Sequence, residues 1–183
     1  MVDDESMHSS LFTGVLLLPA KSIFGTTAEV TLGDGSPVAV IHRKAWSARP
    51  KFEIFDAADT TLLATGKSAG FWGNRYELLG PRWSEPLLEV KFSNWSGPKR
   101  ATVTLPNGLE LTTSGNWSAR NFTVTDSTGG QVAGLVTTSS MWSWRPDSLA
   151  FEINAPVLTL VQAIGMAQCI RTAVEAASAS SGG

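Results

Sequence analysis

The chain has 183 residues, of which 43% are hydrophobic and 16% charged, and its formal net charge is −2. This length fits one domain with a buried core, and the apolar content is too high for a disordered chain. The small net charge argues against a protein whose whole surface binds nucleic acid, which would need an excess of Lys and Arg, although basic residues could still cluster on one face. One cysteine, Cys169, excludes an internal disulfide, and His8 and His42 leave little material for a metal centre. We therefore predict no cofactor, no metal, no nucleic-acid partner and no catalytic residue.

The N-terminus is acidic where a secretory signal would be basic, with Asp3, Asp4 and Glu5 at its start. We predict a flexible N-terminal tail over residues 1–10 and a cytoplasmic protein. The longest uncharged segment, residues 153–170, contains Asn154 and Pro156 and barely reaches the length of a membrane-spanning helix. Any membrane contact is therefore expected to be peripheral rather than transmembrane.

The next part of the chain consists of short alternating or β-branched runs that are separated by turn signals. Examples of these signals are Asp34-Gly35, Gly80-Pro81 and Asn107-Gly108. Many short strands with hairpin-length connections are typical of an antiparallel barrel or sandwich. The predicted strands are residues 12–18, 27–32, 37–43, 51–56, 60–66, 71–79, 86–93, 99–105, 109–114, 119–125, 131–138 and 148–153.

A weak internal repeat runs through these strands. The segment FEIFDAADTTLLA (residues 52–64) resembles NFTVTDSTGGQVA (residues 121–133), and VTLGDGSPVA (residues 30–39) is a shorter copy. In each copy an apolar strand leads to an aspartate: Asp56, Asp126 or Asp34. Because Asp side chains accept hydrogen bonds from turn amides, we interpret the three as turn formers rather than as calcium ligands or catalytic groups.

One helix is predicted, at residues 156–177, with Asn154 or Ala155 as its cap and Pro156 in its first turn. Its first four turns are apolar nearly all round, which is typical of a helix buried on every side, either in a protein core or in lipid. A helix of this length spans ~33 Å, and strands of seven residues span ~23 Å. It would therefore fill a closed barrel, giving a single domain over residues 11–177 and a flexible tail over residues 178–183.

The order of these elements resembles the tubby C-terminal-like superfamily, and most closely its LURP-one-related branch, with phospholipid scramblases as cousins. The segment DGSPVAVIHRKAWSARPKFEIFDA (residues 34–57) looks like a characteristic stretch of that branch: a glycine turn, an aliphatic strand ending in basic residues, a short loop and an F-x-[IV] strand. The resemblance covers about residues 11–177. It implies a closed, mainly antiparallel β-barrel of about twelve strands that encloses the C-terminal helix.

The resemblance also implies a kind of ligand, because tubby domains bind phosphatidylinositol phosphates through surface lysines and arginines. The best basic cluster in this chain flanks one predicted hairpin loop, and Lys or Arg beside an exposed Trp suits a lipid headgroup. The candidate lipid-binding residues are Arg43, Lys44, Trp46, Arg49 and Lys51. The other interpretation is a solvated loop with Trp46 packed inward. No acidic loop resembles the scramblase calcium segment, since only Asp147 and Glu152 lie near the helix.

Seven tryptophans are many for this length, and most lie near predicted turns or strand ends. We interpret them as plugs at the barrel ends or as partners of the helix, rather than as stacking platforms for single-stranded nucleic acid. Cys169 lies on the predicted helix and is interpreted as an inert core residue.

The sequence thus predicts a non-enzymatic binding or tethering module for an anionic phospholipid, a phosphoinositide, at a membrane surface. One alternative is a protein-interaction scaffold without lipid affinity. Another is a barrel that binds a small apolar ligand, or an enzyme that uses such a cavity. The alternatives with a cavity require space inside the barrel, which a helix that fills the interior would remove.

Overall fold

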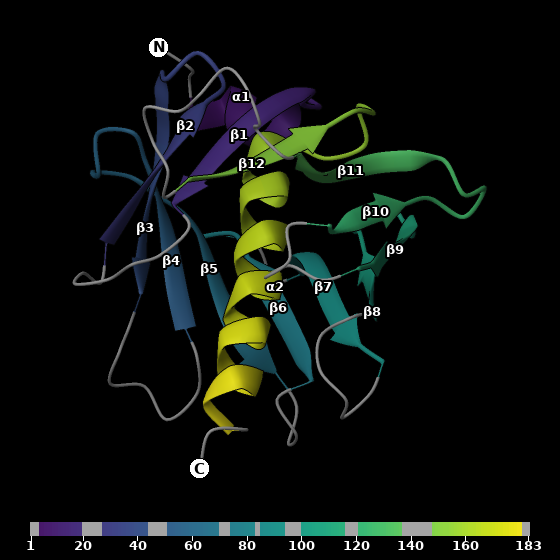
Figure 1. The fold of residues 1–183 in the computed structure, drawn as a ribbon. Helices are drawn as coiled ribbons and strands as arrows, with labels where there is room; N and C mark the ends of the chain where they lie inside the picture. The colour runs from purple at the N-terminus through teal and green to yellow at the C-terminus, as the bar shows by residue number, and fades with distance from the viewer. Residues whose placement is uncertain are drawn as a thin grey trace.

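The computed structural model describes residues 4–19, 27–43, 51–69, 74–82, 85–93, 100–115, 121–136 and 148–180. Twelve antiparallel strands form a closed barrel in which each strand pairs with its neighbours in sequence and β1 pairs with β12 (Figure 1). The strands are β1 (Gly14–Pro19), β2 (Thr27–Leu32), β3 (Pro37–Arg43), β4 (Lys51–Asp56), β5 (Leu62–Ala69), β6 (Arg75–Leu79), β7 (Pro86–Phe92), β8 (Arg100–Thr104), β9 (Glu110–Ser114), β10 (Thr123–Thr125), β11 (Gln131–Val136) and β12 (Ser148–Ile153). The predicted closed, mainly β barrel is confirmed.

The internal repeat predicted from the sequence corresponds to three hairpins with the same register. Val30 lies opposite Ala39 in β2–β3, Ile54 opposite Ala64 in β4–β5, and Val124 opposite Ala133 in β10–β11. A β-bulge follows directly after the first residue of each pair, and all six residues are fully buried. Each copy of the repeat is therefore one bulged hairpin that presents the same aliphatic–alanine pair to the core.

The aspartate of each repeat forms the turn, as predicted. Asp34 Oδ1 accepts a hydrogen bond from Ser36 N (2.8 Å), Asp56 Oδ1 from Thr60 N (2.7 Å), and Asp126 Oδ1 from Gly130 N (2.9 Å). Hydrogen bonds to the charged form lower the pKa of all three carboxyls below the ordinary value. The largest contributions are the Ser36 amide for Asp34, the Thr61 amide for Asp56 and the Thr128 hydroxyl for Asp126.

Helix α2 (Leu160–Ser180) runs through the interior of the barrel (Figure 1). Every residue from Leu158 to Arg171 is buried, and the helix shares one hydrophobic core with the inward faces of the strands. Gly165 lies against Leu78 of β6 so closely that a Cβ built on the glycine would be 2.3 Å from Leu78 Cδ2. The helix therefore fills the space around Gly165.

The helix begins at Leu160, four residues after the predicted start. Thr159 is its cap: its amide donates to Gln162 Oε1 (2.9 Å), and the Gln162 amide donates to Thr159 Oγ1 (3.3 Å). This reciprocal pair is a capping box. The prediction from Asn154, Ala155 and Pro156 was wrong because the Thr-x-x-Gln pattern, three residues farther along, satisfies the first amides of the helix.

Parts of both predicted flexible tails are helical. Asp4–Ser9 form a short helix, α1, whose Met7 side chain is 3% exposed and belongs to the core. The chain that follows is fixed to the start of α2, since Phe12 N donates to Leu158 O at 2.7 Å. At the other terminus, residues 178–180 belong to the last turn of α2. Met7 holds α1 against the core near the start of α2. At the other terminus, α2 continues as far as Ser180.

Because neighbouring strands run in opposite directions, the connections alternate between the two ends of the barrel. We call one end the α1 end: it carries the β2–β3, β4–β5, β6–β7, β8–β9 and β10–β11 turns and the connection from β12 into α2. The opposite end carries the other connections, among them the one between Arg43 and Lys51, and we call it the Arg43 end. The last turns of α2 lie at the Arg43 end, where Arg43 meets Glu175.

Candidate functional site

The structure places two of the five predicted lipid-binding residues. Arg43 is the last residue of β3 and Lys51 the first residue of β4. The other three, Lys44, Trp46 and Arg49, lie outside the described residues, as do all seven tryptophans. The described part of the site therefore consists of the ends of the two flanking strands, β3 and β4, and of the end of α2.

Arg43 and Lys51 lie on opposite faces of the barrel wall. Arg43 is directly opposite Phe52 in the β3–β4 pair, and directly opposed residues share a face of the sheet. Phe52 is 1% exposed and points into the core, so Arg43 also points inward and the neighbouring Lys51 points outward. The Lys51 ammonium lies 3.5 Å from Glu53 on the outer face.

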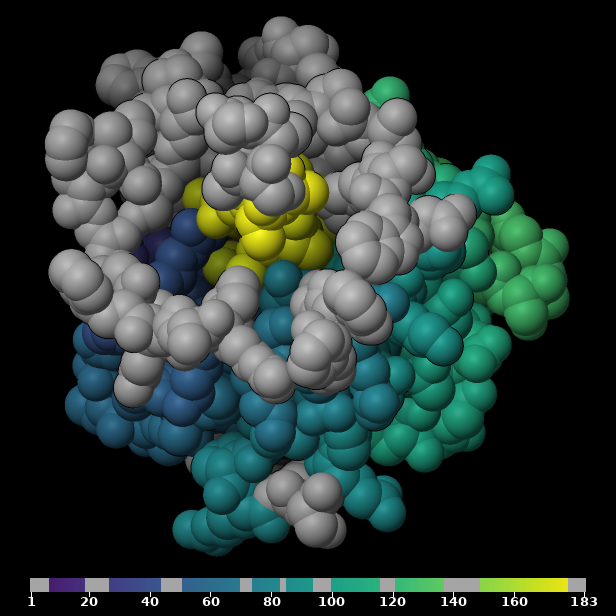
Figure 2. All heavy atoms as spheres, turned by 90° about the horizontal axis from the view of Figure 1, so that it is seen from below, coloured from purple at the N-terminus to yellow at the C-terminus, as the bar shows by residue number. Residues whose placement is uncertain are grey.

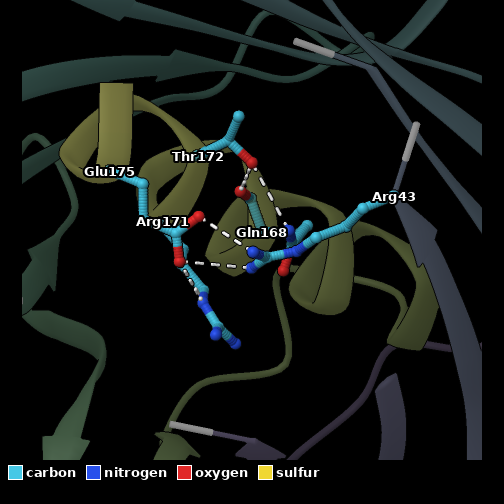
Figure 3. Close-up of polar contacts among 5 residues, drawn as sticks. All are labelled: Arg43, Gln168, Arg171, Thr172 and Glu175. Carbon is cyan, nitrogen blue, oxygen red and sulfur yellow. Dashed lines mark hydrogen bonds and ion pairs between the residues drawn. The ribbon is translucent and has the colours of Figure 1, made fainter. Parts of the chain in front are cut away.

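The guanidinium of Arg43 binds the end of α2 (Figure 3). Its Nη1 donates to Glu175 Oε2 at 2.9 Å and its Nη2 to Glu175 Oε1 at 3.3 Å, which is the bidentate geometry of a strong Arg–carboxylate pair. With the Gln168 amide oriented so that its oxygen faces the guanidinium, Gln168 accepts from Arg43 Nη2 and Nε at 3.3 and 3.2 Å. Arg43 thus ties the edge of β3 to two positions on the helix that lie about two turns apart.

Glu175 also binds a second arginine. Arg171 Nε donates to Glu175 Oε1 at 3.0 Å, one helical turn away, and the Arg171 side chain is only 6% exposed (Figure 3). Burial, together with the nearby charge of Arg43, lowers the pKa of Arg171, while the Glu175 carboxylate opposes this shift. Glu175 itself is half exposed. The carboxylate therefore holds two guanidinium groups together at the Arg43 end of the barrel. Figure 2 shows the molecule from below, with the yellow end of α2 near the centre of the view.

This arrangement fixes the end of the helix to the barrel wall. Removing one partner of a partly buried charge pair leaves the other charge poorly solvated, so each member of this cluster supports the fold. The sequence did not reveal Gln168, Arg171 and Glu175 as partners of Arg43. Two signals point to them: the alternation of Ala39, Ile41 and Arg43 along β3, and the i, i+4 spacing of Arg171 and Glu175.

The contacts of two other potentially reactive side chains, Cys169 and His42, are explained by the fold. Cys169 is fully buried on α2, and burial raises the pKa of its thiol far above the ordinary value, which keeps the thiol protonated at neutral pH. His42 Nε2 lies 2.7 Å from Asp59 Oδ1, and its ring packs edge-on against Phe55. Among the described residues, no group of three His, Cys, Asp or Glu side chains could hold a metal ion.

The described part of the chain contains no helix with both the length and the hydropathy needed to cross a membrane.

Comparisons with known proteins identify the family. The sequence model of the LURP-one-related family matches residues 17–170. Among solved structures, the chain is similar to a protein of Arabidopsis thaliana determined by X-ray crystallography, with a TM-score of 0.59 and 12% identity over 93% of this chain and 97% of that one. No curated protein matches. The structural similarity supports the fold, and the family match covers most of the chain from β1 to the middle of α2. The chain therefore belongs to the LURP-one-related family.

Proposed function

We propose that this protein is a non-enzymatic binding or tethering module that attaches to anionic phospholipid, phosphoinositides included, at a membrane surface. The ligand would be held by the basic cluster at the Arg43 end, through Lys44, Trp46, Arg49 and Lys51. In this proposal Arg43 has a positioning role, because its guanidinium is bound to Glu175 of α2.

Because α2 fills the interior of the barrel, a ligand is expected to bind on the outer surface rather than inside. Residues 158–171 are buried along the axis, and the contact between Gly165 and Leu78 has no room even for a methyl group. A ligand enclosed by the barrel would have to displace this helix and its core contacts. The geometry therefore favours a surface module over a barrel that holds a small apolar ligand.

The observation that carries the proposal is that the basic segment between β3 and β4 begins at a strand end bound to the helix and ends at an exposed lysine. The segment leaves β3 at Arg43, which is fixed to the helix, and enters β4 at Lys51, whose side chain is 39% exposed. A cation close to an anionic bilayer contributes about 1 kcal/mol of binding. Lys44, Arg49 and Lys51 together would contribute ~3 kcal/mol, or about 100-fold in affinity.

Co-sedimentation with vesicles of phosphatidylcholine alone, and with added phosphatidylserine or phosphatidylinositol phosphates, tests the proposal. We expect binding to the anionic vesicles that weakens as salt is raised, and binding about 100-fold weaker for the variant Lys44→Gln/Arg49→Gln/Lys51→Gln. Arg43 is left intact because its replacement would disturb the contact with α2. The matched control, Arg82→Gln/Ser127→Glu/Gln131→Glu, lowers the net charge by the same amount at the α1 end and should bind normally.

The absence of vesicle binding at low salt would contradict the proposal and leave a protein-interaction scaffold as the alternative. Binding that is unchanged in the Lys44/Arg49/Lys51 variant would show that another part of the surface carries the affinity.

A further inference from the structure

The charged residues of the barrel are separated between its two ends. At the α1 end, the turns and the adjoining strand ends hold six carboxylates, Asp34, Asp56, Asp59, Glu85, Glu110 and Asp126, and among the described residues there one cation, Arg82. The net charge of −2 therefore conceals an acidic end. The cations that balance these carboxylates must lie elsewhere on the molecule.

Five of these cations form an arc around the outside of the barrel near the Arg43 end. Five consecutive strands, β4 to β8, each contribute one, and we call the set the basic arc: Lys51, Lys67, Arg75, Lys91 and Arg100. Lys51 lies opposite Lys67, and Arg75 opposite Lys91, so the members of each pair share a face. Lys67, Lys91 and Arg100 are exposed, and the Arg75 side chain is 44% exposed. The lower ends of these strands are visible in Figure 1.

The arc keeps a positive charge after its ion pairs are counted. Three carboxylates on the same face, Glu53, Glu77 and Glu89, pair with Lys51, Lys67 and Arg75, which leaves five cations against three anions. The cross-strand pairs Lys51–Lys67 and Arg75–Lys91 place like charges directly opposite each other, an arrangement that destabilises a sheet. Lys67 also lies opposite Glu77, and Arg75 lies beside Glu77 and Glu89, so these carboxylates compensate part of the repulsion. An external anionic partner would neutralise the remaining excess of two positive charges.

The segments that connect strands at the Arg43 end are also rich in basic residues. These segments lie outside the described residues, and the described ends of the strands that they join lie at the Arg43 end. They contain Lys21, Lys44, Arg49, Lys99, Arg120 and Arg145 against one acid, Asp147. They also contain six of the seven tryptophans: Trp46, Trp72, Trp95, Trp117, Trp142 and Trp144. Trp together with Lys and Arg is typical of protein surfaces at a membrane interface.

We infer that the protein docks on an anionic bilayer end-on, with the basic arc near the Arg43 end as its contact face and the acidic α1 end pointing away. This inference rests on the proposed lipid-binding function and extends it from one loop to the basic arc. A flat bilayer suits this charge distribution because it touches only one end of the molecule. The 21-residue helix α2, about 31 Å long, separates that end from the acidic turns. This is several times the Debye length of about 8 Å at physiological salt.

The width of the arc indicates what the protein recognises. Four gaps of about 4.8 Å between five neighbouring strands spread the cations over about 19 Å. This exceeds the Debye length, so the outer members of the arc do not act on the same phosphate. Recognition therefore depends on the density of negative charge on the bilayer rather than on the stereochemistry of one headgroup. Phosphatidylserine and phosphatidylinositol phosphate vesicles of equal surface charge should bind within a few-fold of each other.

The test uses three proteins and charge-matched vesicles. The variant Lys67→Gln/Lys91→Gln/Arg100→Gln removes three charges of the arc that lie outside the predicted loop site. The control Arg82→Gln/Ser127→Glu/Gln131→Glu lowers the net charge equally at the α1 end. Since each cation near the bilayer contributes about fivefold, we expect the arc variant to bind about 100-fold more weakly and the control to bind within about twofold of the wild type. Circular dichroism and thermal unfolding confirm that each variant is folded.

Tryptophan fluorescence gives an independent readout of orientation. In the wild type and the control, anionic vesicles should shift the emission to the blue, and brominated lipids should quench it, because six of the seven tryptophans belong to connections at the docking end. The arc variant should need about 100-fold more lipid for the same change.

The possible failures are distinguishable. If the wild type binds no anionic vesicle, the proposed function fails and this inference fails with it. If the Lys44/Arg49/Lys51 variant loses binding while the Lys67/Lys91/Arg100 variant keeps it, the loop site stands and end-on docking is overturned. A preference of more than about tenfold for phosphatidylinositol phosphate at equal surface charge would overturn recognition by charge density.

Equal losses in the arc variant and the α1-end control would overturn the role of the arc. Binding to RNA but not to vesicles would overturn the membrane as the partner.

Discussion

Gly165 shows how closely single residues in the core of this barrel fit each other. It lies in the buried part of α2 with Leu78 of β6 directly over its Cα, where a side chain would be expected. Glycine in the middle of a helix costs about 1 kcal/mol relative to alanine. In this position the cost is offset because the helix can approach the barrel wall more closely.

Replacing Gly165 with alanine should destabilise the protein by about 1–2 kcal/mol, although alanine is the better helix former. The added methyl group would lie 2.3 Å from Leu78 Cδ2, and because Leu78 is fully buried its side chain would have to repack within the core. Urea unfolding of Gly165→Ala, Leu78→Ala and the double variant measures the coupling between the two residues. In the double variant the alanine should cost nothing beyond Leu78→Ala, because the clash is gone. A Gly165→Ala protein more stable than the wild type would show that the helix does not pack against β6 here.

Arg43 shows why the candidate site could be only partly predicted at the residue scale. The sequence shows four cations in nine residues, Arg43, Lys44, Arg49 and Lys51, but a cluster in sequence is not a cluster in space. The pleat of β3 and β4 sends Arg43 toward the helix and Lys51 outward. The partner of Arg43, Glu175, is 132 residues away in sequence, a separation at which pattern analysis of a single sequence has little power.

At the scale of elements, the start of α2 is held by one side chain that makes two kinds of contact. Gln162 accepts from the Thr159 amide, and its Nε2 donates to the carbonyl oxygen of Leu87 at 2.9 Å. Leu87 is the extra residue of a β-bulge, because the β6–β7 register passes from the Leu78–Leu88 pair to the Leu79–Pro86 pair. A bulge takes a residue out of the ladder, and Gln162 supplies the hydrogen bond that the Leu87 carbonyl then needs inside the protein.

Substitutions at Thr159 and Gln162 should therefore have unequal effects. Thr159→Ala removes only the cap and should cost about 1 kcal/mol. Gln162→Leu also leaves the buried Leu87 carbonyl without this donor, and should cost about 2–4 kcal/mol in total. Urea unfolding of both variants measures the difference, and Gln162→Glu is the control, because it retains the acceptor for the Thr159 amide but cannot donate to Leu87. Equal losses for Thr159→Ala and Gln162→Leu would mean that the bond to Leu87 adds no stability.

The strands were predictable because their signals are local, whereas the ends of the helices were not. Turn residues and alternation placed twelve strands, and the Asp34, Asp56 and Asp126 repeat identified three hairpins of equal register. The start of α2 was misplaced because proline at residue 156 suggested a first turn, while the capping box at Thr159 decides the boundary. Helix α1 was missed because its Met7 is buried only in the assembled core.

At the scale of the whole molecule, the position of α2 determines both the fold and the kind of function that the fold permits. A meander of twelve strands would leave an open interior, and the apolar surface of α2 fills it. With the interior occupied, the outside of the barrel and its two ends remain for binding. Successive connections alternate between the two ends, and most of their acidic residues belong to one set of connections while most of their basic residues belong to the other, so charge is separated between the ends. The sequence already contains this asymmetry, but it becomes visible only when each connection is assigned to an end.

Cys169 offers the most direct measurement of whether α2 lies inside the barrel. It is the one cysteine of the chain, it lies near the middle of α2, and its side chain is fully buried. A thiol reagent that reacts with the thiolate reports on this position alone. In native buffer, labelling should proceed only as fast as global unfolding, with the urea dependence of the full unfolding transition. Stoichiometric labelling of the native protein within seconds and without denaturant would contradict a helix enclosed by the barrel.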